Sequence, residues 1–303
     1  MSGNSTESSV NESCPPPHAD TRKPKAEFPL GTCDSHCHVM GPFSKYPLPA
    51  TRSYTPAEAP EEALRAMHKR IGVDRAVIIQ SQGHGLDHSA LLDALEVGDG
   101  RYKGVAVLST ESTSEQVARF HAAGICGVRL NFMKHLSGIQ TYSEMSSIIA
   151  LVKPFNWHIA LHMTSSDIVE HHDFIKSIGL RVAIDHMGRP SLPEGVDSIG
   201  LTTLRQLLDT DTVWVKMSGV ERLSRSGAPF SDAFAIARSL AEHAPDRLLW
   251  GTDWPHVNLH GPMPNDGDLA DFVSIIAPTP TLRRKLLIDN PNQFFDFEGI
   301  IPT

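Results

Sequence analysis

Short β-rich runs alternate with helical stretches along most of this chain, and this alternation constrains the fold more than any other feature. Eight such runs follow one another between residues 33 and 254, separated by amphipathic segments. Several of those segments open with Ser or Asp and close near Gly, as helices do at their caps. Strands joined through helices are parallel and connected by right-handed crossovers. The runs are 33–39, 76–80, 104–108, 127–131, 158–163, 181–187, 213–219 and 248–254.

Eight strand–helix units predict an α/β fold of the (β/α)8 TIM-type barrel class. An open doubly wound sheet is the alternative, but no G-x-G-x-x-G motif follows any of the runs. We expect one barrel domain over residues 28–303, because no linker divides this region. Residues 1–27 are rich in Ser, Pro and charge, and we expect them to form a disordered tail. An arm that wraps a neighbouring subunit is the alternative for this tail.

The composition limits the partners of the chain. A net charge of −8 without any block of like charges argues against nucleic acid or an anionic membrane surface. No apolar run reaches the ~18 residues that a membrane span needs. The four cysteines form neither a disulfide framework nor a C-x-x-C zinc pattern, and residues 1–27 hold no apolar signal segment. We therefore expect a cytoplasmic protein acting on a small molecule; a homo-oligomer is compatible with the sequence.

Titratable side chains gather at the ends of the predicted strands, which is where a barrel enzyme carries its active site. Strand alternation predicts that Asp34, His36 and His38 share one face of the first strand. Other strand ends carry a titratable residue where a purely structural strand would carry Val or Ile: His162, His186 and Asp253.

Imidazoles and a carboxylate at one barrel mouth suit a zinc-type site that keeps an open position for water. Such an ion lowers the pKa of its water toward ~7, and Asp253 could then accept the proton as general base. We expect one divalent ion, with Zn²⁺ as the best candidate and metal-free catalysis as the alternative. The non-catalytic alternative is a cluster of polar side chains at the barrel mouth that only hydrogen-bond to one another. The expected ligands are His36, His38 and Asp253, with His162 or His186.

Three arginines could hold an anionic substrate, because the planar guanidinium binds a carboxylate or sulfonate through two hydrogen bonds. Each of them could instead form a structural ion pair. Lys216, on the seventh strand, could likewise enter the pocket or form a buried ion pair. The three arginines are Arg129, Arg189 and Arg222.

The segments CDSHCHVMGPFSKYPL, GVRLNFMKH, AIDHMGRP and LLWGTDWPHVN resemble the amidohydrolase superfamily, specifically its 2-pyrone-4,6-dicarboxylate lactonase-like branch. The similarity runs in order from about residue 33 to residue 297. It implies a (β/α)8 barrel and hydrolysis of small anionic lactones in bacterial catabolism. It also implies that His36 and His38 line the site, that His186 helps to polarise the lactone carbonyl, and that Asp253 activates water.

The resemblance extends to the substrate-binding residues, with three departures from the branch pattern. This chain has His162 where the pyrone lactonases carry Tyr, His135 where they carry a second Arg, and Gln82 where they carry Ser. Those lactonases are described as working without a metal, whereas His162 restores a fifth-strand histidine that metal-dependent members use as a ligand. The resemblance implies that the anionic groups of the substrate contact Arg129, Arg189, Arg222 and Tyr54, with His135 and Gln82 beside them.

These departures imply a substrate anion of different shape or position. Within the branch they fit 4-sulfomuconolactone, which carries a carboxylate and a sulfonate and yields maleylacetate and sulfite. We therefore expect that substrate, with 2-pyrone-4,6-dicarboxylate as the alternative. A metal-dependent decarboxylase of the same superfamily is an alternative of another reaction class. A barrel retained as a binding or scaffold protein is the non-enzymatic alternative.

Overall fold

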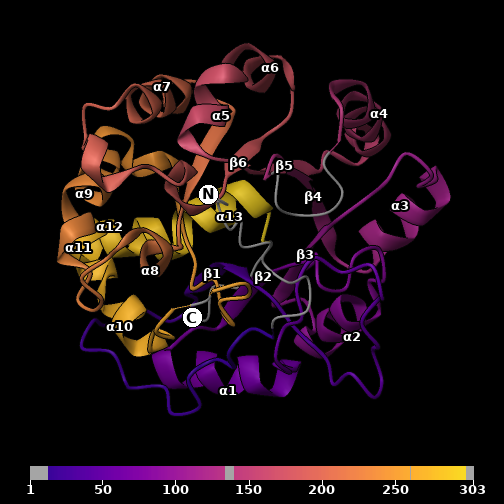
Figure 1. Ribbon diagram of the computed structural model, residues 1–303, viewed down its shortest axis with the longest axis horizontal. Helices are drawn as coiled ribbons and strands as arrows, with labels where there is room; N and C mark the ends of the chain where they lie inside the picture. The colour runs from indigo at the N-terminus through magenta and orange to yellow at the C-terminus, as the bar shows by residue number, and fades with distance from the viewer. Residues whose placement is uncertain (1–12, 134–139, 260, 298–303) are drawn as a thin grey trace, which may run out of the picture.

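Eight parallel strands form one sheet in the order β1 to β8, and each predicted run overlaps one of these strands. A computed structural model describes residues 13–133, 140–259 and 261–297 (Figure 1). The strands are β1 Cys33–Cys37, β2 Arg75–Ile79, β3 Tyr102–Ala106, β4 Ile125–Asn131, β5 His158–His162, β6 Val182–Ile184, β7 Val213–Met217 and β8 Leu248–Trp250.

Helices surround the sheet and connect its strands (Figure 1). Within the described ranges, none of them is long and apolar enough to span a bilayer. The helices are α1 Glu61–Ile71, α2 Ser89–Gly98, α3 Ser114–Ala122, α4 Tyr142–Val152, α5 Ser165–Glu170, α6 His172–Ser177, α7 Ile199–Leu208, α8 Val220–Leu223, α9 Phe234–His243, α10 Asp266–Asp271, α11 Val273–Ile276, α12 Pro280–Arg284 and α13 Asn290–Phe295.

Backbone hydrogen bonds bring the two ends of the sheet together. The Asp253 amide donates to the His36 carbonyl and the His38 amide donates to the Trp254 carbonyl, both at 2.8 Å. Gly251 permits this approach, since a Cβ there would lie 2.7 Å from the backbone nitrogen of His36. The predicted (β/α)8 barrel is confirmed, and the alternative of an open doubly wound sheet is wrong, because consecutive strands are neighbours throughout.

An irregularity in β1 changes which side chains share a face. The β1–β2 register shifts between Asp34 and Cys37, where the strand holds a β-bulge or similar distortion. Asp34 consequently faces α1 and pairs with His68, whereas His36 contacts Asp185 of the barrel interior. The prediction that Asp34 shares a face with His36 is therefore wrong, because an extra residue in a strand interrupts the two-residue alternation.

Apolar side chains fill two regions on either side of the strands. The larger cluster lies between the strands and the helices, and includes Cys37, Leu64 and Met67. A smaller cluster includes Cys33, Val77 and Val105 of neighbouring strands, and Phe294 and Phe295 of α13 pack with it. The polar residues of the candidate site lie at the other ends of the strands, which are their carboxyl ends.

Residues 13–27, which the sequence analysis placed in the tail, lie against the barrel in the structure. Arg22 donates to Asp268 of α10 at 2.5 Å and to Asp271 at 2.6 Å. The amides of Lys25 and Ala26 also donate to Asp271. The structure differs from the expected disorder here because polar contacts with α10, together with the burial of Cys14, hold this segment against the barrel. Residues 1–12 lie outside the described residues.

Candidate active site

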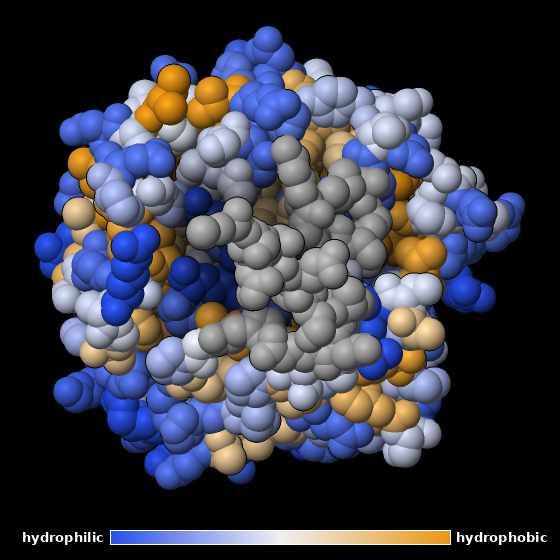
Figure 2. Space-filling view, in the orientation of Figure 1, coloured by the Kyte–Doolittle hydropathy of each residue, from blue (hydrophilic) through white to orange (hydrophobic). Residues whose placement is uncertain are grey.

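The predicted site residues surround one cavity at the carboxyl ends of the strands. Figure 2 shows that this face of the molecule is hollowed, and the visible wall of the hollow is mainly hydrophilic. The structure therefore brings together nine of the residues singled out from the sequence, whereas His135 lies outside the described residues. The cavity is lined by His38, Tyr54, Gln82, Arg129, His162, His186, Arg189, Arg222, Asp253, Val257 and Asn258.

Asp253 lies at the centre of a group of histidines. Its Oδ1 atom is 3.6 Å from Nε2 of His36, 3.6 Å from Nε2 of His38 and 3.9 Å from Nε2 of His186. Asp253 has a φ of 65° and His186 a φ of 54°, a left-handed conformation that side chains other than glycine rarely adopt. Strained backbone of this kind clusters at functional sites, where it aims side chains that a regular strand would not.

The carboxylate of Asp253 is ionised in this setting. Burial opposes its ionisation, but Arg222 and His186 outweigh that effect and hold the pKa well below its usual value. Arg222 contributes most, because its Nε donates to Asp253 Oδ2 at 2.6 Å. A second donor of the same guanidinium bonds the Val257 carbonyl at 2.9 Å, which fixes the orientation of the arginine.

Asp185 is a second buried carboxylate, which the sequence analysis missed. Its oxygens lie 3.1 Å from Lys216 Nζ, 3.1 Å from Arg129 and 3.3 Å from Nδ1 of His36. Burial would raise the pKa of Asp185, but Lys216, His36 and Arg129 hold it well below its usual value. Lys216 thus forms the buried ion pair rather than entering the pocket. The signal in the sequence was the position of Asp185, immediately before His186 at the end of β6.

Three of the predicted histidines are neutral near pH 7. Burial, followed by the charge of Lys216, lowers the pKa of His36 to about 4. Burial is also the largest cause of the lowered pKa values of His162 and His186, which fall well below the usual histidine range. Neutral imidazole is the form that binds a metal ion or accepts a hydrogen bond.

His162 occupies a different part of the cavity from the central group. Arg189 Nη1 donates to its Nε2 atom at 3.0 Å, which occupies that nitrogen's lone pair. His162 is absent from the groups of the described residues whose ligand atoms converge closely enough to hold an ion. It lines the cavity, and its ring centroid lies 5.6 Å from that of His186.

The residues at the centre of the site fit a divalent cation. The Nδ1–H of His38 donates to the Ile79 carbonyl at 2.8 Å, which leaves the Nε2 lone pair directed at Asp253. Nε2 of His36 is buried without a hydrogen-bond partner among the described residues. Two ligands that each lie about 2.1 Å from a tetrahedral zinc ion are about 3.4 Å apart. The observed separations of 3.6 Å match this arrangement, and a cation would satisfy acceptor atoms that otherwise face one another.

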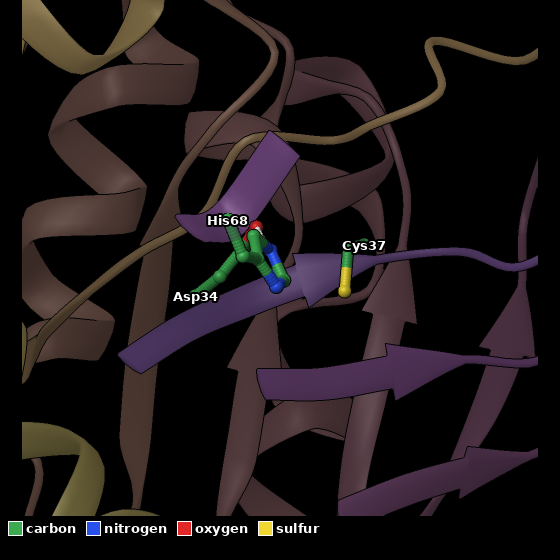
Figure 3. Close-up of side chains that lie close together, drawn as sticks. All are labelled: Asp34, Cys37 and His68. Atoms are coloured by element: carbon green, nitrogen blue, oxygen red, sulfur yellow. Dashed lines mark hydrogen bonds and ion pairs between the residues drawn. The ribbon is translucent and has the colours of Figure 1, made fainter. Parts of the chain in front are cut away.

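A second close group has a structural explanation. Asp34, Cys37 and His68 also lie near one another, with His68 over Asp34 and Cys37 farther along β1 (Figure 3). The Asp34 carboxylate already accepts hydrogen bonds from His68, from the His36 amide, and from the amide and hydroxyl of Thr252. Burial raises the pKa of the Cys37 thiol well above its usual value, so the thiol stays protonated. This group braces β1 against the segment after β8.

Comparisons with known proteins agree with this geometry. A model of the amidohydrolase family matches residues 33–297. The 2-pyrone-4,6-dicarboxylate hydrolase of Comamonas testosteroni is 38% identical over 287 residues, covering 92% of this chain and 94% of the relative. The 4-sulfomuconolactone hydrolase of Hydrogenophaga intermedia is 34% identical over 289 residues, covering 94% and 95%.

A solved structure shares both the fold and part of the sequence. It is a probable 2-pyrone-4,6-dicarboxylic acid hydrolase from Acinetobacter baumannii with citric acid bound. The match has a TM-score of 0.77 and 25% identity, and it covers 88% of this chain and all of the other. The chain belongs to the amidohydrolase family. The predictions of this family, of its lactonase-like branch and of a hydrolase are confirmed.

Proposed function

We propose that this protein hydrolyses a small lactone with anionic substituents by attack of water on the ring carbonyl. The observation that carries the proposal is the placement of three guanidinium groups and an ionised carboxylate around one cavity. Arg129, Arg189 and Arg222 line that cavity together with Asp253. Arginine side chains bind carboxylate and sulfonate groups, so a ring with acidic substituents would lie between them with its carbonyl near Asp253.

Asp253 acts as the base that receives the proton of the attacking water. Its carboxylate is ionised, as this role requires, and it lines the cavity directly. The Arg222 hydrogen bond holds Oδ2 and leaves Oδ1 directed at the histidines. The water therefore approaches on the Oδ1 side.

His186 stabilises the charge that develops on the carbonyl oxygen. Its Nδ1 atom lies 2.9 Å from the Ser218 hydroxyl. When Ser218 donates to Nδ1, the ring carries its proton on Nε2, which faces the cavity and can donate to the oxyanion. A donor of this kind typically contributes ~3–4 kcal/mol of transition-state stabilisation.

His36, His38 and Asp253 would hold a divalent ion, with Zn²⁺ the best candidate and His186 beside them. When bound, such an ion supplies an acidified water and polarises the carbonyl. His36 and His38 present ring nitrogens from β1 and from the residue just after it, and Asp185 supports the outer nitrogen of His36. His162 stays bonded to Arg189 and contributes to the substrate cavity.

We assign 4-sulfomuconolactone as the substrate, with 2-pyrone-4,6-dicarboxylate as the second candidate. His162 and Gln82 both line the cavity, so two of the three positions where the chain departs from the pyrone lactonases border the proposed substrate site. The higher identity to the Comamonas testosteroni pyrone hydrolase supports the second candidate.

The test is the hydrolysis of both lactones, side by side on one preparation. We expect ring opening with a higher kcat/KM for 4-sulfomuconolactone, followed by release of sulfite. A higher value for the pyrone would assign the second substrate to the same site. Absence of turnover with both lactones would contradict the proposed function, and release of carbon dioxide would indicate a decarboxylase instead.

A further inference from the structure

The N-terminal segment that precedes the barrel reaches the candidate site. We define residues 13–22 as the N-terminal strap. The strap lies outside residues 33–297, which the family model matches. Figure 1 shows the indigo N-terminal chain passing beside α10 and α1, and Arg70 of α1 donates to the Thr21 carbonyl at 3.1 Å. The strap therefore adds to this barrel a feature that the family model does not describe.

One end of the strap packs behind the wall of the substrate cavity. Ser13 and Thr55 form a parallel β-bridge, and the Cys14 amide donates to the Thr55 carbonyl at 2.8 Å. Cys14 is 5% exposed and packs in one small apolar cluster with Tyr54 and Met133. Val257 packs against the same cluster.

Tyr54 connects the strap to the cavity. It belongs to the apolar cluster that contains Cys14, and it also lines the cavity. The Tyr54 hydroxyl lies 2.7 Å from the Ser81 hydroxyl. Because Tyr54 and Val257 both line the cavity and both pack on the cluster that contains Cys14, a displaced strap removes support from two wall residues at once.

The other end of the strap is anchored on α10. Arg22 donates to Asp268 and Asp271 and also to the Gly267 carbonyl at 3.0 Å. The Arg22 amide donates to Asn265 at 2.8 Å. Gly267 is required for this contact, because a Cβ there would lie 2.1 Å from the Arg22 carbonyl oxygen.

We propose that the N-terminal strap is a specificity-determining part of the substrate pocket, in which Cys14 positions Tyr54 and Val257 against the bound lactone. This inference rests on the proposed function for the identity of the ligand. The strap contacts no residue assigned to proton transfer in the interactions described above. Val257 accepts the Arg222 hydrogen bond through its backbone carbonyl, whereas it packs on the cluster of Cys14 as an apolar residue. Loss of the strap should therefore weaken substrate binding more than it slows the chemical step.

The test uses two full-length variants that release the strap by different means. Arg22→Ala removes the ionic anchor, and Gly267→Ala forces the strap away from α10. Arg181→Ala is the matched control, because Arg181 also bonds an aspartate, Asp296, but does so beside the start of β6. Alkylation of Cys14 by iodoacetamide, followed by peptide mass spectrometry, reports release of the strap, since this thiol is buried when the strap is docked.

In both strap variants we expect about tenfold faster alkylation of Cys14, because local opening exposes the thiol. We expect KM for the hydrolysed lactone to rise about fivefold, with kcat within about twofold of the native value. The Arg181→Ala control should change neither quantity. A general loss of stability would lower kcat as well, so the separation of KM from kcat identifies a role in binding.

Faster alkylation with an unchanged KM would overturn the proposal, because the strap would then be released without consequence for the pocket. Unchanged alkylation in both variants would overturn it as well, since the strap would not depend on these anchors. If the native protein binds a lactone without hydrolysing it, the proposed function fails, and Kd from calorimetry replaces KM in the same comparison. A fivefold weaker Kd in the strap variants would still support the strap.

Discussion

Replacing Lys216 by Met should destabilise the fold strongly, because it leaves the carboxylate of Asp185 short of a counter-charge inside the barrel. Both side chains are fully buried, and Lys216 Nζ lies 3.1 Å from Asp185 Oδ1. At an effective dielectric constant of about 20, two unit charges at that distance attract by about 5 kcal/mol. Removal of one partner from a buried pair costs about 3–5 kcal/mol. Arg129 remains at 3.1 Å from the other oxygen of Asp185, so we expect the lower end, ~3 kcal/mol.

The assay is chemical denaturation of the native and Lys216→Met proteins at several pH values. A loss of ~3 kcal/mol is within the 5–15 kcal/mol that a folded domain has available, so the variant should still fold. Lys45→Met is the control, because its ion pair with Asp93 is exposed, and it should leave the denaturation midpoint nearly unchanged.

The pH dependence follows from the sign of the pKa shift. Lys216 is the strongest of the charges that lower the pKa of Asp185, so this pKa should rise in Lys216→Met. Protonation of Asp185 then removes the unpaired charge. The difference in the free energy of unfolding between the native protein and Lys216→Met should therefore become smaller as the pH falls toward about 4. The double variant Asp185→Asn, Lys216→Met should recover most of the lost stability. A loss below ~1 kcal/mol, or a deficit independent of pH, would refute this electrostatic explanation.

Three further predictions concern other parts of the barrel. Burial and, after it, the charge of Lys216 lower the pKa of His158 in the folded protein well below its usual value. In the unfolded chain this histidine keeps its usual pKa, so as the pH falls below about 6.5 the unfolded chain takes up a proton before the folded protein does, and the folded state loses stability. Between pH 6.5 and 5, the free energy of unfolding of the native protein should fall by up to ~2 kcal/mol relative to that of His158→Phe, as measured by chemical denaturation. Parallel pH dependences of the two proteins would contradict this. Gly251→Ala, whose Cβ would lie 2.7 Å from the His36 backbone, should cost ~1–3 kcal/mol and most of the activity. Gly261→Ala, with no atom within 4 Å of its Cβ, should cost little, and equal effects would show that crowding is not the cause. His38→Ala should reduce bound zinc, measured by plasma mass spectrometry, from about one ion per chain to near zero. Unchanged zinc would remove His38 from the ligand set.

The sequence predicted the barrel and most of the cavity because both follow from short-range rules. Strand alternation and the rule that barrel enzymes carry their sites at strand ends together located His36, His38 and Asp253. The same alternation placed Asp34 on the wrong face, because nothing in the residues 33–39 marks the register shift in β1. A distortion of this kind depends on the neighbouring strand.

Two other features depend on contacts between distant parts of the chain. Asp185 is the counter-ion of Lys216 and Arg129, and this pairing follows only when the strands from β4 to β7 are placed in order around the barrel. The docking of residues 13–27 depends on Asp268 and Asp271, which are more than 240 positions away from Arg22. Composition alone favours disorder for such a segment, since its few apolar residues give little indication of a partner.

The role of Asp253 as the base is decided by the turnover of Asp253→Asn, with binding measured on the same preparation. We expect kcat for the hydrolysed lactone to fall by about 10³-fold, because the attacking water loses its base. The Kd of the lactone, measured by calorimetry, should stay within a few-fold of the native value or become tighter, since Arg222 loses its competing carboxylate. Asp93→Asn, an exposed change of the same chemistry, should alter neither quantity. A kcat within about tenfold of the native value would contradict the role of Asp253, and with it the proposed mechanism.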